Sequence, residues 1–212
     1  MDYKEIAKEN YKKFSFVEGN EYIASEYAII TILKLLADFK INSILEVGLG
    51  IGSISDTIFK YAKKRGIAID YTGTEANEYC LTALKSNVGD YNDIHLYASI
   101  SEIKGNPKYD FIIVDGSDES LQSIAAFCKP DTILFIEGYR GSQVGLLKDI
   151  FPGCAHVEII SSYRNPDYGP FPNDRWTGGG QLIFINPGFY KKWYWFAEKA
   201  KSFLKRRLRK LK

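Results

Sequence analysis

The pattern of apolar and polar positions predicts two helices at the start of the chain. Residues 2–14 are mostly polar with a helical repeat of apolar positions. Residues 20–39 place Ile23, Tyr27, Ile30, Leu33 and Leu36 at helical spacing, which is typical of an amphipathic helix that packs on a core. We expect residues 1–42 to form a helical cap on the domain that follows.

Downstream of residue 42, short apolar runs alternate with helical patterns. This alternation is typical of a doubly wound, mostly parallel sheet with helices on both faces. Two further strands follow with no helix between them, so the last part of the sheet departs from the βα rhythm. The predicted strands are 43–47, 67–74, 94–97, 109–114, 132–136, 157–161 and 181–185, and the predicted helices are 53–64, 78–86, 118–128 and 142–150.

The charge of the chain is unevenly distributed. The net charge is +2, yet residues 189–212 hold ten Lys and Arg against Glu198, so the other residues carry −7. An apolar stripe runs through this basic tail, which predicts an amphipathic helix over 191–212. Three interpretations stay open: binding to an anionic membrane surface, packing on the domain, or binding nucleic acid, which fits an apolar stripe less well. We therefore expect one domain over residues 1–188 and a separate tail over 189–212.

Cysteine usage and the first residues bear on location. The three cysteines are far apart and odd in number, which favours a reducing compartment. The opening residues are polar, unlike a secretory signal. We expect a cytoplasmic protein, with the tail able to hold it at the inner face of the membrane.

A glycine-rich turn follows the first predicted strand. Gly48, Gly50 and Gly52 stand where a strand enters a helix, and the first N–H groups of that helix are free to meet a ligand. The spacing differs from the dinucleotide pattern G-x-G-x-x-G, because Ser53 occupies the third position. Glu46 lies in the strand itself, and a buried acid needs strong hydrogen-bond donors or a cationic partner such as an ammonium group.

These residues resemble the class I S-adenosylmethionine (SAM) methyltransferases, whose first motif is E/D-x-G-x-G-x-G. The resemblance continues at the end of the second strand, in the D-x-x-x-x-D spacing of Asp110 and Asp115, and in the last two strands, which match the reversed C-terminal hairpin of that seven-stranded fold. It covers residues 43–187 and implies SAM as the cofactor, with Glu75 accepting hydrogen bonds from the ribose hydroxyls. The cofactor-binding residues it implies are Glu46, Gly48, Gly50, Gly52, Glu75, Ala76 and Asp115.

Candidate catalytic acids follow the fourth and fifth strands. Asp115 and Glu137 end these strands, and Asp118 comes shortly after; Asp118 could equally cap the next helix. Metal-dependent O-methyltransferases of this family hold a divalent ion at these strand ends. Because Glu137-Gly138 stands where an Asp-Asn pair is often found, we expect no metal, with Asp115 and Glu137 as the ligands if one binds.

The long loop 162–180 is expected to act as a lid. It mixes aromatic and hydrogen-bonding side chains, a combination that suits a polyhydroxylated or aromatic acceptor. Candidate acceptor-binding residues are Tyr139, Arg140, Arg175 and Trp176.

The leading hypothesis is SAM-dependent O-methylation of a small-molecule or glycan hydroxyl. An RNA methyltransferase that uses the tail for phosphate contacts is one alternative, although no N/D-P-P-Y/F signature is present. The other alternative is a membrane-peripheral binding module that keeps the cofactor fold without turnover.

Overall fold

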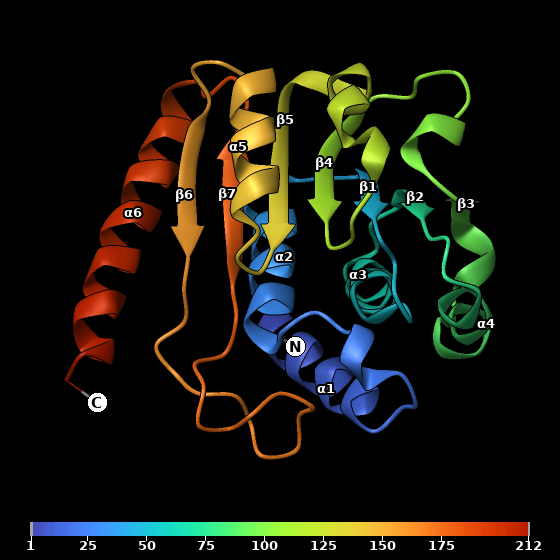
Figure 1. Ribbon diagram of the computed structural model, residues 1–212, viewed down its shortest axis with the longest axis horizontal. Coiled ribbons are helices and arrows are strands. Elements are labelled where there is room, and N and C mark those ends of the chain that lie inside the picture. Colours follow the sequence, from blue (N-terminus) through green and yellow to red (C-terminus); the bar gives the residue numbers. More distant parts are fainter. Residues whose placement is uncertain (1, 212) are drawn as a thin grey trace.

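The chain folds around one seven-stranded sheet with the strand order β3-β2-β1-β4-β5-β7-β6 (Figure 1). The computed structural model describes residues 2–211. All neighbouring strands are parallel except β7, which is antiparallel to both β5 and β6. The strands are β1 (Ser43–Val47), β2 (Asp70–Thr74), β3 (Ile94–Tyr97), β4 (Tyr109–Val114), β5 (Cys128–Glu137), β6 (Ala155–Ile159) and β7 (Gly180–Phe184).

Helices cover both faces of the sheet. The α-helices are α1 (Tyr3–Ser15), α2 (Glu26–Phe39), α3 (Ser53–Arg65), α4 (Glu78–Asn87), α5 (Gly141–Ile150) and α6 (Phe189–Arg209); the 3-10 helices are η1 (Asn20–Tyr22), η2 (Tyr91–Asp93), η3 (Ile100–Glu102) and η4 (Glu119–Phe127). The predicted doubly wound, mostly parallel sheet with a reversed C-terminal hairpin is confirmed.

Side chains alternate between two apolar cores, one on each face. In β4, Phe111 and Ile113 pack with α1, α2 and α3, whereas Ile112 and Val114 pack with η4 and α5. This alternation is the period-two pattern of a strand covered on both faces. It explains why the central strands read as unbroken apolar runs.

The direction of the chain through the sheet positions a site. From β1 the chain adds β2 and β3 on one side and then crosses to β4 and β5 on the other. Ligands bind at such a switch point, at the carboxyl ends of the strands. In Figure 1 these ends of β1, β4 and β5 point toward the bottom of the view, where the long loop between β6 and β7 also lies.

Two predicted helices differ from the structure. Residues 20–39 are not one helix. The 3-10 helix η1 ends at Tyr22, Ile23 and Ser25 have extended backbone, and α2 begins at Glu26. The second difference concerns the predicted helix 118–128, where the structure has the 3-10 helix η4. The strand β5 then begins at Cys128 rather than at residue 132. Tyr109 pairs with Cys128 and Phe111 with Ile133, so the register between β4 and β5 shifts near the start of β5.

The tail forms a helix that packs on the sheet. The α6 helix begins two residues before the predicted start and ends at Arg209; Lys212 lies outside the described residues. Its inner face contacts β6 through Trp195 Nε1, which donates to His156 O at 2.7 Å, and Ser202 Oγ, which donates to Glu158 O at 2.7 Å. The interpretation of the tail as a helix packed on the domain is therefore correct for one of its faces.

Candidate active site

The glycine turn brings three segments of backbone into close contact. Gly48 and Gly50 have φ values of +86° and +54°, a region that favours glycine. A Cβ on Gly48 would lie 2.5 Å from Gly116 Cα, and one on Gly50 would lie 2.5 Å from Tyr22 O. The turn is thus pressed between the end of β4 and the segment before α2, and only glycine fits at either position.

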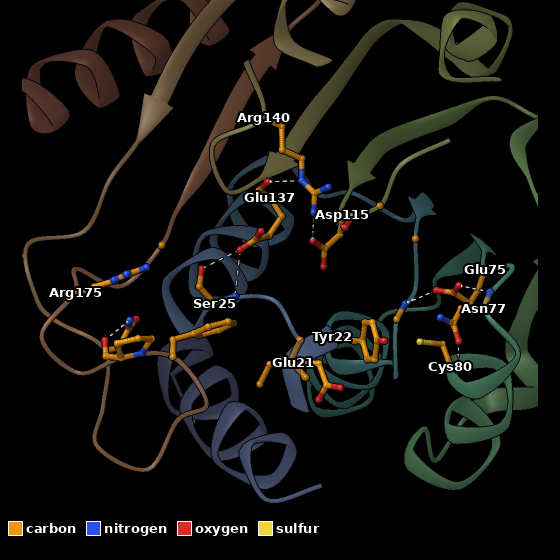
Figure 2. Close-up of a pocket in the computed structure, with 18 of the residues that line it drawn as sticks. Glu21, Tyr22, Ser25, Glu75, Asn77, Cys80, Asp115, Glu137, Arg140 and Arg175 are labelled. Carbon is orange, nitrogen blue, oxygen red and sulfur yellow. Dashed lines mark hydrogen bonds and ion pairs between the residues drawn. The ribbon is translucent and has the colours of Figure 1, made fainter. Parts of the chain in front are cut away.

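A cavity of about 570 Å³ opens beside this turn, at the carboxyl ends of the strands (Figure 2). Glu75 and Asn77 lie at one end and Arg175 at the other, with Asp115, Glu137 and Arg140 between them on one wall and Glu21 and Tyr22 on the opposite wall. The other lining residues are Ile23, Ser25, Gly48, Gly50, Cys80, Gly116, Asn165, Phe171, Pro172, Trp176 and Gly178.

Glu75 is held in place by backbone N–H groups. Its Oε2 accepts from Gly50 N at 2.8 Å, and its Oε1 accepts from Ala76 N at 2.9 Å and Asn77 N at 2.8 Å. Charge-assisted bonds of this kind fix a carboxylate firmly. Three of its four lone pairs are used, and the remaining one, on Oε2, can accept from a ligand. Glu75 therefore links the glycine turn to the start of α4 and presents an acceptor to the cavity.

Glu46 lies beneath the cavity floor and does not line it. The side chain is fully buried, and Tyr71 OH donates to its Oε2. Its Oε1 has no hydrogen-bond partner among the described residues. Burial raises the pKa of Glu46 from 4.5 to about 8, and Glu75 adds to this, while the bond from Tyr71 opposes it. An orphaned buried oxygen next to the turn is ready to accept a donor.

Asp115, Glu137 and Arg140 form a compact cluster at the ends of β4 and β5 (Figure 2). Arg140 Nη2 donates to Asp115 O at 2.7 Å and lies 3.4 Å from Asp115 Oδ1. Glu137 Oε1 accepts from Ser25 N at 3.2 Å and Ser25 Oγ at 3.1 Å. This pair joins residues 112 positions apart in the sequence.

The cluster holds carboxyl groups that are harder to ionise than usual. Burial raises the pKa of Asp115 well above its ordinary value, and repulsion from Glu137 and Glu46 raises it further, against the opposing charge of Arg140. Burial also raises the pKa of Glu137, although the two bonds from Ser25 oppose the shift. Carboxyl groups shifted in this direction are suited to proton transfer nearer neutral pH.

The loop between β6 and β7 closes one side of the cavity. Asn165 N donates to Arg175 O at 3.0 Å, and Thr177 N donates to Tyr163 O at 3.1 Å. These hydrogen bonds hold the two ends of the loop together. Trp176 lines the cavity, and the guanidinium of Arg209 lies 5.1 Å from its ring centroid. The loop therefore lines the cavity, and its action as a lid stays a prediction.

Several predicted site residues lie elsewhere. Asp118 does not line the cavity: its carboxylate accepts from Ser120 N at 2.7 Å and Ile100 N at 2.9 Å, so its role is to cap η4. Tyr139 is 83% exposed and points away. Gly52 packs against the α4 side, where a Cβ would lie 2.3 Å from Val88 Cγ2. Ala76 contributes only its N–H to Glu75.

Other lining residues escaped the sequence analysis. Glu21, Tyr22 and Ser25 reach the cavity because the chain leaves helical geometry before α2. A serine followed by Glu26 is a helix-start signal within the predicted long helix, and it could have revealed the break. Asn77 was also missed; its side chain caps α4 by accepting from Tyr79 N and Cys80 N.

The donor set does not fit a metal centre. Within residues 2–211, no group of three or more His, Cys, Asp and Glu side chains is placed to hold an ion. The predicted ligand pair supplies two carboxylates, Asp115 and Glu137, and the guanidinium of Arg140 contacts one of them, Asp115. Oxygen-rich coordination needs more ligands than these two supply.

Solved structures share this architecture. With the Bacillus cereus O-methyltransferase bound to S-adenosylhomocysteine, the TM-score is 0.56 at 13% identity, over 84% of this chain and 89% of that one. With the Streptomyces achromogenes O-methyltransferase TomG, which is involved in tomaymycin synthesis and was solved with SAM, it is 0.56 at 10% identity, over 88% and 91%. The chain has the class I methyltransferase fold.

The methyltransferase fold is established by structure alone. Neither a protein-family model nor a curated protein matches the sequence. A Thermoplasma acidophilum protein assigned as a methyltransferase gives a TM-score of 0.50 at 21% identity, over 68% of this chain and 66% of that one, so the chain spans about two thirds of its length. The resemblance predicted from the glycine motif is confirmed at the level of the fold.

Proposed function

We propose that the chain is a SAM-dependent methyltransferase that methylates a hydroxyl group of a small molecule or glycan. The observation that carries this proposal is one cavity that runs from the glycine turn and Glu75 at one end, past the half-buried Asp115–Glu137 pair on its wall, to Arg175 at the other end. Methyl transfer requires these two functions side by side: donor binding and control of an acceptor proton.

The residues at the donor end fit SAM. Gly48 and Gly50 let the turn pack closely against Gly116 and Tyr22, so that its backbone lines the cavity. Glu75 is fixed beside it, with a lone pair on Oε2 left to accept from a ribose hydroxyl. Glu46 does not line the cavity, so its orphaned Oε1 would meet the ammonium group through water. When bound, SAM supplies an electrophilic methyl group on a sulfonium.

The residues at the other end would position and deprotonate the acceptor. Glu137, held by Ser25, is the candidate base: it would accept the hydroxyl proton as the oxygen bonds to the methyl carbon and the carbon–sulfur bond breaks. Arg140 keeps Asp115 in place beside it. Arg175 and Trp176 line the far wall, where an aromatic ring and a guanidinium suit a polyhydroxylated or aromatic acceptor.

Calorimetry with SAM tests the donor site. The full chain should bind, and Gly50→Ala should bind far more weakly, because its Cβ would meet Tyr22 O at 2.5 Å. Gly145→Ala is the matched control, since no atom lies within 4 Å of its added Cβ. Absence of binding by the unaltered chain, or equal binding by Gly50→Ala, would contradict the assignment.

Transfer of a labelled methyl group from SAM to a panel of sugars, catechols and RNA tests the acceptor. We expect transfer to hydroxyl acceptors that Glu137→Gln abolishes while leaving SAM binding intact. Transfer to RNA bases alone would favour the RNA methyltransferase alternative. Tight SAM binding without transfer to any acceptor would favour a non-catalytic binding module.

A further inference from the structure

The outer surface of α6 is unusual for a helix on a globular protein. Surface helices normally turn apolar residues to the core and charged residues to solvent. On α6 many large apolar side chains face outward: Phe189, Trp193 and Phe196 are 86%, 63% and 55% exposed. Of fifteen large exposed hydrophobic residues in the described chain, eight lie between residues 189 and 211.

The inner surface of α6 packs two aromatic rings, Tyr194 and Trp195, together with several polar groups. Glu198 is buried and pairs with Lys201 at 2.8 Å, and Lys205 donates to Ile160 O at 2.9 Å. Glu198 lies nine residues after Phe189, which at 100° per residue places it half a turn away, on the opposite side of the helix. The exposed apolar face is therefore a property of the packed helix rather than of an undocked tail.

The outer face is continuous along the whole helix. Trp193 and Phe196 stack with ring centroids 5.8 Å apart, and Phe203 and Leu204 extend the face by two further turns. Figure 1 shows α6 at the edge of the molecule, with only β6 and the sheet on one side of it. A face of this size on a soluble protein usually marks an interaction surface.

Cations surround this apolar face. The 21 residues of α6 contain eight Lys and Arg against Glu198. Lys192, Lys199, Arg207 and Lys210 have no acidic partner among residues 2–211. A tryptophan and phenylalanines on an apolar stripe, flanked by free cations, are what a helix lying in an anionic membrane interface requires.

We propose that the outer face of α6 binds an anionic membrane surface with the helix axis parallel to the bilayer. The helix would lie on the membrane rather than cross it, because no helix in the described part of the chain is long and apolar enough to span. The proposal is independent of the methyltransferase activity. It places the C-terminal end of α6, which contacts Trp176 through Arg209, beside the cavity wall at the membrane.

Charge favours a membrane over the other occupants. In a symmetric dimer the same face would meet itself, which brings two strongly cationic helices together. Nucleic acid would satisfy the cations but leave Phe196, Phe203 and Leu204 without apolar partners. Anionic lipid satisfies both sets of groups at once.

Vesicle flotation with the full chain tests the proposal. The chain should bind vesicles of phosphatidylcholine with phosphatidylglycerol and should bind vesicles of phosphatidylcholine alone much more weakly. Binding to the anionic vesicles should fall about fivefold for each cation neutralised in Lys192→Gln and Lys210→Gln. The double variant Phe196→Ser/Phe203→Ser should bind at least about tenfold more weakly, because both rings leave the interface. Emission from Trp193 should shift to the blue on binding.

Phe16→Ser is the matched control, because Phe16 is 70% exposed at the end of α1 and far along the chain from α6. It should bind vesicles like the unaltered chain. Equal flotation of Phe16→Ser and of the Phe196→Ser/Phe203→Ser variant would overturn the proposal. Two other results would also do so: a dimer that the double variant dissociates without any vesicle binding, or binding to RNA with no partition onto anionic vesicles.

Discussion

Replacement of Glu46 by glutamine should change how stability depends on pH. The native carboxyl has a pKa of about 8 because it is buried, against an ordinary value of 4.5 in an unfolded chain. Between these two pH values the native state keeps a proton that the unfolded state has lost. Stability therefore falls as pH rises through this window, by about 1.4 kcal/mol per pH unit at most.

The size of the effect follows from the two pKa values. Between pH 5 and pH 7, Glu46 should remove about 2 to 3 kcal/mol from the free energy of unfolding. Glu46→Gln has no proton to lose and keeps an oxygen for Tyr71. The half-buried acids Asp115 and Glu137 also have raised pKa values, so they act in the same direction and remain in the variant. The informative quantity is thus the difference between the two proteins.

Urea unfolding at pH 5, 6, 7 and 8 measures that difference. We expect the glutamine variant to gain stability relative to the unaltered chain as pH rises, with a plateau above the native pKa of Glu46. Glu46→Met also removes the titration and should show the same pH-dependent difference, offset by a constant amount because Tyr71 loses its acceptor. Parallel curves for the unaltered chain and both variants would refute the argument that burial keeps this carboxyl protonated.

Three further predictions concern the cavity. Glu75→Gln should weaken SAM binding about tenfold to a hundredfold in calorimetry, because an amide cannot accept all the bonds that the carboxylate accepts; unchanged affinity would remove Glu75 from the donor site. Ser25→Ala removes a donor that stabilises the Glu137 carboxylate, so the pKa of Glu137 should rise and the ascending limb of the kcat/KM profile should move to higher pH; a shift to lower pH would contradict Glu137 as the base. Arg175→Ala should raise KM for the acceptor while the affinity for SAM stays the same, measured by steady-state kinetics and calorimetry; equal losses in both would place Arg175 in the donor site.

The fold was readable from the sequence where local pattern and tertiary packing agree. The apolar run 109–114 is buried on both faces, so its hydrophobicity needed no long-range information. The error before α2 has the opposite cause. Ile23 falls at helical spacing and is buried, but it is buried from an extended segment that follows η1. Periodicity records which side chains are buried and says less about the backbone that buries them.

The site was only partly readable for a related reason. The glycine turn is a local motif, and it correctly marked one end of the cavity. The Ser25–Glu137 pair joins the start of α2 to the end of β5, and no spacing rule links two such residues. Asp118 shows the converse: an acid just after β4 fitted either catalysis or capping, and the bonds from Ser120 N and Ile100 N show that its carboxylate caps η4.

Glu46 and Glu75 look alike in the motif, but the structure gives them different physical roles. Glu75 is satisfied by three backbone N–H groups and faces the cavity, so it is suited to contact a ligand. Glu46 is buried with one oxygen unpaired, and its charge is one of the causes that raise the pKa of Asp115. Near neutral pH, however, the high pKa of Glu46 keeps this carboxyl mostly protonated and uncharged. A cation that ionised Glu46 would bring a positive charge of its own, so its effect and that of the Glu46 carboxylate on the pKa of Asp115 would largely cancel. The donor end of the cavity can therefore be filled without making Asp115 much harder to ionise.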